Sequence, residues 1–289
     1  MKKSLQFTIL LFILFCLLMT GKYFYTTKAE TALAMGTMVT VKGNGASVAI
    51  AEIKRLDHLF SKFDPSSEVS RINAAAGRSP VKVSDDTFNA IAQALWVAKL
   101  SGGAFDITLR KNGSWQDVSI NKYQKTVFLK KAGIEIDLGG IGKGCAVQRA
   151  GKLLRSLGAK KALIDMRSSI AAIGGPWKIG LQDPQKSGAM MGVITLNDGD
   201  ALSTSGQYEQ PGHIINPLSG KVANQCISVT IVAKDAGLAD ALSTAAFVLG
   251  PDRGMKLIKS LPGTECLIID SQGKLMLSSG FKRFMSLSD

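Results

Sequence analysis

The chain has 289 residues, of which 46% are hydrophobic and 20% are charged, with 30 glycines and only 8 prolines. This composition is that of a folded globular protein with a sizeable core, and it excludes a disordered or low-complexity polymer. The formal net charge is +13, because 35 basic residues face 22 acidic ones. Such a balance favours anionic partners but does not decide the fold. We expect no nucleic-acid partner, because the sequence has no zinc-finger spacing, aromatic RNA-binding signature or basic run.

The first 29 residues have the pattern of an export signal. Two lysines precede an apolar run over residues 5–19, and a polar stretch ends at Ala29, which is the order of a cleavable signal peptide. The run is shorter than the ~20 residues that span a bilayer, although the aromatic residues 23–25 could extend it into an uncleaved anchor. We therefore expect an exported protein, either periplasmic or anchored to the outer face of the cytoplasmic membrane, with one functional domain over residues 30–289.

Hydrophobic periodicity then predicts strands and helices that interleave without a regular β-α-β repeat. Ser84 is the expected N-cap of the second helix, which Gly102 and Gly103 end. In chain order, the patterns predict a strand at 38–41, helices at 50–60 and 85–100, strands at 127–129 and 134–137, a helix around 147–157, strands at 162–166, 177–181, 192–196 and 226–233, and a helix at 236–249. We expect one compact α+β unit of mixed sheets and helices, and a division into two lobes would place a ligand cleft between them.

Three cysteines follow the leader, and they are widely separated with no C-x-x-C pair: Cys145, Cys226 and Cys266. At most one disulfide can form, and scattered cysteines of this kind are typical of buried small hydrophobic side chains. Because His58 and His213 are the only histidines, a Cys/His zinc site is nearly excluded. Any metal must therefore be bound by oxygen atoms.

The glycine-rich turn from Asp137 to Gly144 is the first candidate site. It places a carboxylate at a strand end, glycines that let the backbone approach a ligand, and Lys143 at the start of a helix. Exposed N–H groups at a helix N-terminus attract anions, so the turn would suit a phosphate. The alternative is an ordinary strand-to-helix turn with a solvated lysine, since the turn matches neither the Walker pattern nor the Rossmann fingerprint.

A second candidate lies within the helix at 236–249. Asp240 and Thr244 are four residues apart, so a carboxylate and a hydroxyl project from one helix face. Together they could bind a hard cation such as Mg²⁺, which prefers oxygen ligands. Alternatively, Asp240 complements the helix dipole and Thr244 bonds back to the carbonyl four residues earlier.

His213 is the third candidate, in the segment Gly212–Pro217. An imidazole can accept a proton from a hydroxyl near neutral pH, which makes His213 a candidate general base, although a satisfied loop histidine is the alternative. His58 lies in an amphipathic helix beside Leu59 and Phe60, and we expect it to be structural. A serine-hydrolase triad is not supported, because the sequence contains no G-x-S-x-G elbow.

Seven short motifs follow one another in a fixed order: Met35-Gly36-Thr37, Ser67–Asn73, Gly103–Asp106, Asp137–Gly144, Ser203–Gly206, His213–Pro217 and Ala239–Thr244. Together they resemble the FAD:protein FMN transferases, also called ApbE-like flavin transferases, over roughly residues 33–280. The resemblance implies a Mg²⁺-dependent enzyme outside the cytoplasm that binds FAD, cleaves its pyrophosphate, joins FMN to a threonine hydroxyl of an acceptor protein and releases AMP. It also implies that the acceptors are subunits of membrane redox complexes, such as sodium-pumping quinone reductases.

The resemblance also implies roles for individual residues. His213 would be the base for the incoming threonine. Mg²⁺ would be held by Asp240, by Thr244 and by the carbonyl oxygen of Gly140. The FAD site would be lined by Met35, Ala104, Phe105, Asp106, Asp137, Lys143 and Ile214.

The sequence departs from the family pattern in three places. The family usually has Asn-x-Gly-Gly-Asp after the central strand, and this chain has Asp165-Met166-Arg167-Ser168-Ser169. Where the family has two glycines, whose backbone could approach the nucleotide closely, this chain has residues with side chains. The added arginine, Arg167, could instead bind phosphate. Asn216 replaces the usual acid after the histidine motif, and Phe63 stands where a tyrosine is expected. The departures leave open a second reading, in which the chain is a weakly active or non-catalytic periplasmic FAD-binding protein or an FAD pyrophosphatase.

Overall fold

The computed structural model describes residues 29–109, 112–186, 188–207 and 212–287. Its helices are α2 (Ala46–Phe60), α3 (Glu68–Ala74), α4 (Asp85–Leu100), α5 (Gly142–Ser156), α6 (Ala236–Leu249) and α7 (Pro251–Lys259), with the 3-10 turns η1 (Trp115–Asp117) and η2 (Phe281–Arg283). Its strands are β1 (Ala29–Ala34), β2 (Thr37–Gly43), β3 (Val81–Lys82), β4 (Val118–Asn121), β5 (Thr126–Leu129), β6 (Ala162–Asp165), β7 (Ser169–Ile173), β8 (Trp177–Gln182), β9 (Met190–Leu196), β10 (Ala201–Gly206), β11 (Cys226–Ala233), β12 (Glu265–Asp270), β13 (Leu275–Leu277) and β14 (Met285–Leu287).

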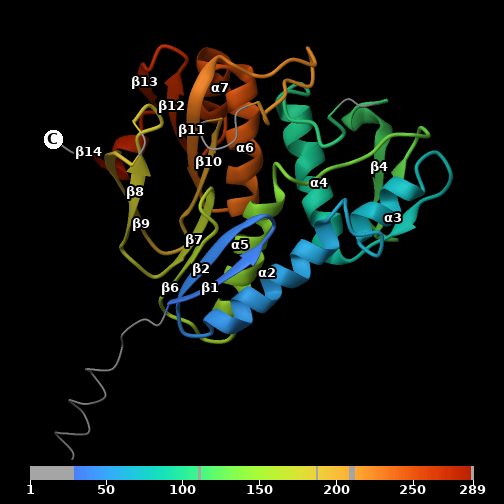
Figure 1. The fold of residues 1–289 in the computed structure, drawn as a ribbon, viewed down its shortest axis with the longest axis horizontal. Coiled ribbons are helices and arrows are strands. Elements are labelled where there is room, and N and C mark those ends of the chain that lie inside the picture. The colour runs from blue at the N-terminus through green and yellow to red at the C-terminus, as the bar shows by residue number, and fades with distance from the viewer. Residues whose placement is uncertain (1–28, 110–111, 187, 208–211, 288–289) are drawn as a thin grey trace, which may run out of the picture.

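The largest sheet has eight strands in the order β1-β2-β6-β7-β10-β11-β12-β13, and every neighbouring pair is antiparallel. Two smaller antiparallel sheets have the orders β14-β9-β8 and β3-β5-β4. In Figure 1 the helices α2, α5 and α6 cover the large sheet, β8 and β9 lie to the left, and α3, α4 and β4 form a part to the right. The expected α+β class is thus confirmed.

Alternating side chains place a hydrophobic core on each face of the large sheet. On β6 and β12, Ile164 and Ile268 pack in the cluster that includes the helices, whereas Leu163 and Leu267 pack in the cluster that includes β8 and β9. This arrangement follows from the period of two in a strand, which sends successive side chains to opposite faces. The large sheet is therefore the middle layer between helices and the β14-β9-β8 sheet.

The helix predictions are confirmed closely. The predicted helix at 236–249 is α6 with the same bounds, and the helix that follows the glycine-rich turn is α5, closed before Gly158. Ser84 caps α4 as expected, because its side-chain oxygen accepts a hydrogen bond from the N–H of Thr87 at 3.3 Å. Capping by Ser satisfies one of the helix N–H groups that lack an intrahelical partner.

The strand predicted at 134–137 is wrong. Ile134 and Ile136 are fully buried, as their alternation suggested, but the segment pairs with no strand among the described residues. The side-chain amide of Asn73 takes the place of a neighbouring strand: its Oδ1 accepts from the N–H of Ile136 at 2.8 Å, and its Nδ2 donates to the carbonyl of Ile136 at 3.0 Å. The N–H of Asp137 donates to the carbonyl of Ile107 at 2.8 Å. Burial periodicity therefore identified an extended segment but not its hydrogen-bond partner.

The predicted leader, residues 1–29, lies outside the described residues except for Ala29, the first residue of β1. Within the part that the structure describes, no helix is long and apolar enough to cross a bilayer. Cys226 and Cys266 are buried and Cys145 is half-buried, and all three are free thiols. Burial raises the pKa of Cys226 to about 12 and that of Cys266 to about 11, so both behave as the small hydrophobic side chains that we expected.

Candidate functional site

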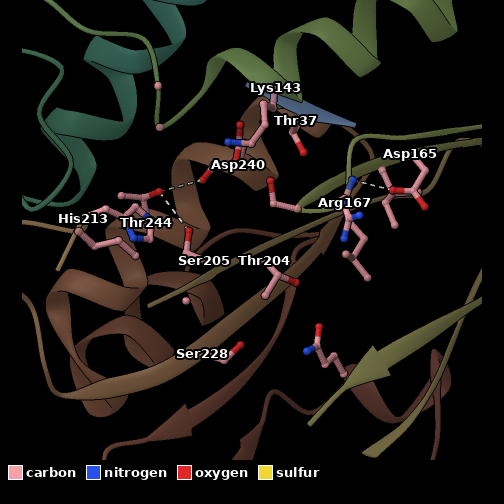
Figure 2. A pocket seen from close by; sticks show the side chains of 18 of the residues that line it. Thr37, Lys143, Asp165, Arg167, Thr204, Ser205, His213, Ser228, Asp240 and Thr244 are labelled. Carbon is pink, nitrogen blue, oxygen red and sulfur yellow. Dashed lines mark hydrogen bonds between the residues drawn. The ribbon is translucent and has the colours of Figure 1, made fainter. Parts of the chain in front are cut away.

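All eleven residues singled out from the sequence line one cavity, whose volume is about 930 Å³. The cavity runs between the large sheet, the start of α5 and the strands β8 and β9, and Figure 2 shows part of its wall. A volume of this size is at the upper end of the range for small-molecule and cofactor sites. The lining residues from the sequence are Met35, Ala104, Phe105, Asp106, Asp137, Gly140, Lys143, His213, Ile214, Asp240 and Thr244.

The glycine-rich turn places the N-terminus of α5 against this cavity. Ile141, at the N-cap position, provides no side-chain hydrogen bond to the helix. Asp137 stabilises the turn, because its Oδ1 accepts from the N–H of Gly139 at 2.8 Å while its Oδ2 pairs with Lys62 at 2.7 Å. Lys143, the second residue of α5, lines the cavity. A helix N-terminus beside a lysine is suited to binding an anionic group.

Asp240 is a buried carboxylate that joins α6 to α5 and to the large sheet. Its Oδ2 accepts from the N–H of Gly144 at 2.8 Å, and its Oδ1 accepts from the hydroxyl of Ser203 on β10 at 2.9 Å. Burial raises the pKa of Asp240, while the charge of Lys143 and the hydrogen bonds from Gly144 and from Ser203 and Ser169 act in the opposite direction. A carboxylate removed from water in this way is stabilised by a nearby cation.

Thr244 lies one turn of α6 after Asp240. Its Oγ1 is 3.2 Å from the hydroxyl of Ser205 and 3.5 Å from the carbonyl of Asp240, so the back-bond considered as the alternative is present only at the limit of hydrogen-bond distance. The backbone of Gly140 is close by, since a Cβ placed on Gly140 would be 3.7 Å from the Thr244 hydroxyl and 2.9 Å from the ring of Phe105. A side chain at position 140 would therefore clash with Phe105.

These oxygen atoms fit a hard divalent cation. No group of three or more His, Cys, Asp or Glu that could hold a metal occurs within the described ranges, so a cation here would depend on carbonyl and hydroxyl ligands as well as Asp240. A carboxylate, a threonine hydroxyl and a backbone carbonyl are all ligands that Mg²⁺ accepts, and Mg²⁺ usually keeps several waters besides one or two carboxylates. A cation held here would therefore be bound by oxygen atoms alone.

The segment Ala104–Asp106 forms another part of the wall, and its three residues are buried. The carboxylate of Asp106 is engaged in the loop itself: its Oδ1 accepts from the N–H and the hydroxyl of Thr108, at 2.9 and 2.7 Å, and its Oδ2 accepts from the N–H of Trp115 at 3.1 Å. Asp106 therefore fixes the shape of this wall, and Phe105 contributes an apolar surface to it.

His213 and Ile214 line the cavity from the segment between β10 and β11. In the view of Figure 2, His213 lies on the same side of the cavity as Thr244, and Arg167 lies on the opposite side. The segment is held by Gln207, whose Oε1 accepts from the N–H of Gly212 at 2.7 Å. His58, which we expected to be structural, pairs with Asp64 at 2.8 Å just beyond the end of α2.

Residues 165–169, where the sequence departs from the family pattern, form a tight turn at the cavity wall. Arg167 has φ = +62°, a left-handed conformation that suits the glycine of the family pattern, and its N–H donates to Oδ1 of Asp165 at 2.7 Å. Ser168 also lines the cavity, and its buried hydroxyl has no hydrogen-bond partner among the described residues. Ser169, where the family has an acid, lies 3.1 Å from the hydroxyl of Ser203 and so joins the hydrogen bonds around Asp240.

Phe63 does not belong to the cavity. Its ring is 85% exposed beyond the end of α2, where the ammonium group of Lys62 lies 5.2 Å from the ring centre. It is absent from the lining of the cavity, so Phe63 is not part of the candidate site. Asn216 uses its side chain locally, with Oδ1 accepting from the N–H of Leu218 at 2.9 Å.

Sequence reasoning missed the wall formed by β8 and β9. Lys178, Gln182, Met190 and Met191 line the cavity from these strands. Nothing in their own sequence indicates a site, because they lie on two short amphipathic strands that are typical of a sheet surface. Thr204 and Ser205 also line the cavity. Both belong to the motif Ser203–Gly206, which sequence reasoning identified without assigning a role to either residue.

Known proteins resemble this chain in both sequence and structure. The sequence matches the ApbE family over residues 35–112 and 108–268. An FAD:protein FMN transferase of Klebsiella pneumoniae (strain 342) is 29% identical, with 86% of this chain and 91% of that protein covered. Another, of Treponema pallidum (strain Nichols), is 27% identical over 79% of this chain and 77% of that protein.

Solved structures of known proteins share the fold of this chain. The crystal structure of the ApbE protein of Thermotoga maritima superposes with a TM-score of 0.80 at 30% identity, covering 89% of this chain and 98% of that chain. The flavin transferase ApbE of Vibrio cholerae also superposes with a TM-score of 0.80, covering 89% and 98% of the two chains. At 24% identity, this second likeness shows the fold alone.

Proposed function

The chain belongs to the ApbE family and is an FAD:protein FMN transferase, and from this premise we propose that it transfers FMN from FAD to a threonine hydroxyl with the help of Mg²⁺. The observation that carries the proposal is that eleven residues, chosen from five separate motifs, line one cavity. In the reaction, the threonine oxygen bonds to the FMN phosphorus. The bond from that phosphorus to the bridging oxygen breaks, and AMP leaves with the electron pair.

His213 receives the proton that the threonine hydroxyl loses. Its position on the cavity wall supports this role, and a positioned general base typically contributes 10²- to 10⁴-fold in rate. Lys143 and the N-terminus of α5 stabilise the negative charge that develops on the phosphate oxygens during cleavage. Phe105 supplies an apolar surface for FAD, while Asp106 and Asp137 hold the loop and the glycine-rich turn in the shape that the cavity requires.

Asp240, Thr244 and the carbonyl of Gly140 are the residues that would hold Mg²⁺. The bound ion would neutralise charge on the diphosphate and the leaving phosphate. Ser203 and the N–H of Gly144 keep the Asp240 carboxylate in one orientation through their hydrogen bonds at 2.9 and 2.8 Å. The Ser205 hydroxyl orients Thr244 in the same way, at 3.2 Å.

We propose that the protein acts outside the cytoplasm, on subunits of membrane redox complexes. The export-type pattern of residues 1–29 supports the compartment. Whether the leader is cleaved or remains as an anchor decides only how far the domain can move from the membrane. The active domain is the same in both cases.

The test is to incubate the purified protein with FAD, Mg²⁺ and a threonine-bearing subunit of a sodium-pumping quinone reductase. We expect the acceptor to gain the mass of FMN, less one water, and AMP to appear in equal amount. An acceptor in which the threonine is replaced by alanine is the matched control. Tight FAD binding with no adduct would support the flavin-binding alternative, and AMP without adduct would support the pyrophosphatase.

A further inference from the structure

Three basic side chains from three different elements line the cavity. Lys42 is on β2, Arg167 is in the turn between β6 and β7, and Lys178 is on β8, and all three are exposed residues of the cavity lining. Within the part of the chain that the structure describes, none of them forms an ion pair. The charges of Lys42 and Arg167 do act on Asp165, where they oppose the rise that burial causes in the pKa of its carboxyl. Lys62, by contrast, pairs directly with Asp137 at 2.7 Å.

Hydrogen bonds hold the backbone on both sides of Arg167, so the position of its Cα is fixed. The N–H of Arg167 donates to Asp165, the N–H of Ser168 donates to the carbonyl of Met166 at 2.8 Å, and the carbonyl of Ser168 accepts from the N–H of Thr204 at 2.8 Å. Lys42 is fixed through the register of β2 with β6, in which it faces Leu163. Figure 2 shows Arg167 across the cavity from Thr244 and His213.

Exposed apolar side chains accompany these cations. Met38, Leu109 and Met190 line the same cavity, and they are 39, 52 and 61% exposed. Methionine adapts its shape to different partners, and exposed apolar groups beside polar ones mark interaction surfaces more often than ordinary solvated ones. We call the six residues Met38, Lys42, Leu109, Arg167, Lys178 and Met190 the rim.

We propose that the rim docks the acceptor protein, through a segment in which acidic and apolar side chains flank the hydroxyl that receives FMN. This inference rests on the proposed function, because that reaction brings a second macromolecule to the cavity. Charge complementarity selects the chemistry of the segment, since three exposed cations that form no ion pair among the described residues favour carboxylates and disfavour basic segments. The apolar side chains of the rim supply contact area for the residues between those carboxylates.

The diphosphate of FAD is a less suitable occupant of the rim. The proposed anion-binding groups, Lys143 and the N-terminus of α5, adjoin Asp240, whereas Arg167 lies on the far side of the cavity from Thr244 (Figure 2). Exposed cations act mainly by steering and orienting a charged macromolecule, an effect that raises association rates by about 10- to 10³-fold and that salt suppresses. The rim should therefore affect the acceptor and leave FAD binding unchanged.

The test compares two double variants with the same change in charge. Lys42→Glu/Lys178→Glu reverses two charges of the rim, and Lys122→Glu/Lys160→Glu reverses two exposed lysines outside the cavity lining. Flavinylation of the quinone reductase subunit is measured against acceptor and FAD concentration. We expect the rim variant to lose about tenfold in kcat/KM for the acceptor with the KM for FAD unchanged, and the other variant to match the wild type within about twofold.

A second arm changes the acceptor. In a synthetic peptide designed with Asp and Glu beside the acceptor threonine, replacement of these two residues by Asn and Gln should slow the wild-type protein but hardly affect the rim variant. The difference between the two proteins should shrink in about 1 M salt, where the screening length falls to about 3 Å. An unchanged kcat/KM for the acceptor, or a raised KM for FAD, would overturn the inference. Absence of flavinylation by the wild type would instead refute the proposed function.

Discussion

Asp240 shows how a single residue can serve both the fold and the site. Its two carboxylate oxygens accept hydrogen bonds from Gly144 on α5 and Ser203 on β10, so it ties three elements together. The same carboxylate lines the cavity beside Thr244. A substitution of Asp240 alone would thus disturb stability and metal binding together, and His213 and Arg167 offer cleaner tests at this scale.

His213→Ala should separate binding from chemistry. If the imidazole accepts the threonine proton, transfer should slow by about 10²- to 10⁴-fold, while the affinity for FAD changes little. Quenching of flavin fluorescence measures binding, and the acceptor mass measures transfer. An equal loss of both would mean that His213 only shapes the cavity wall.

Arg167→Gly should stabilise the fold. The left-handed conformation at φ = +62° costs an L-residue about 1–2 kcal/mol and costs glycine almost nothing. We expect the melting temperature to rise by about 2–4 °C. Arg167→Ala is the matched control, because it removes the guanidinium but keeps the Cβ. Equal melting temperatures for the two variants would show that the backbone at this turn is not strained.

At the scale of elements, the close approach of α5 to α6 depends on glycine. A Cβ at Gly144 would lie 2.2 Å from the carbonyl oxygen of Ala236 and 2.6 Å from the Cβ of Asp240, whereas a Cβ at Gly151 on the same helix would only reach Ile164 at 3.6 Å. The first contact is far too short and the second is an ordinary van der Waals distance. The glycine-rich motif therefore has a packing role in addition to its approach to a ligand.

This contrast gives a paired prediction. Gly144→Ala should destabilise the protein by about 1–3 kcal/mol through overpacking, and it should weaken Mg²⁺ binding because Asp240 must move. Gly151→Ala should be neutral or stabilise by up to about 1 kcal/mol, because alanine favours a helix interior. Chemical denaturation of both variants checks the prediction, and a loss for Gly151→Ala as large as for Gly144→Ala would contradict it.

The sequence was most informative for elements with strong local signals. Both α4 and α6 have clear periodicity and a side-chain cap at Ser84 or Asp235, so their existence and bounds could be predicted. The strand expected at 134–137 could not be distinguished from an extended segment that bonds to Asn73, 63 residues away. Strands such as β7 and β10 are short and small-residue-rich, and only their neighbours in the sheet define them.

The same limit applies to the candidate site. Five motifs gave eleven lining residues because each motif contains polar side chains that stand out from its surroundings. Sequence reasoning missed the wall from β8 and β9, because Lys178 and Met190 have the sequence pattern of ordinary surface residues. They line the cavity only because the β14-β9-β8 sheet packs against the large sheet. Tertiary packing, which short motifs do not encode, completes the cavity.

At the scale of the whole molecule, the cavity joins the helix layer, the large sheet and the β14-β9-β8 sheet. A ligand that contacts all three should oppose unfolding of the entire domain. FAD at about 100 times its dissociation constant should stabilise the protein by about 2.7 kcal/mol, and adding Mg²⁺ should increase the effect. Removal of divalent cations by EDTA should abolish this increment in a thermal melt, whereas an increment that survives EDTA would argue against a metal beside the diphosphate.

The central claim is that segments far apart in the chain form one cation site next to the diphosphate of FAD. Crystals grown with FAD and Mn²⁺, a stand-in for Mg²⁺ with strong anomalous scattering, test it most directly. The account predicts an anomalous peak within about 2.0–2.3 Å of the Asp240 carboxylate, the Thr244 hydroxyl and the Gly140 carbonyl, in contact with the diphosphate. FAD bound in the cavity with the cation elsewhere, or with none of these three oxygens coordinated, would contradict it.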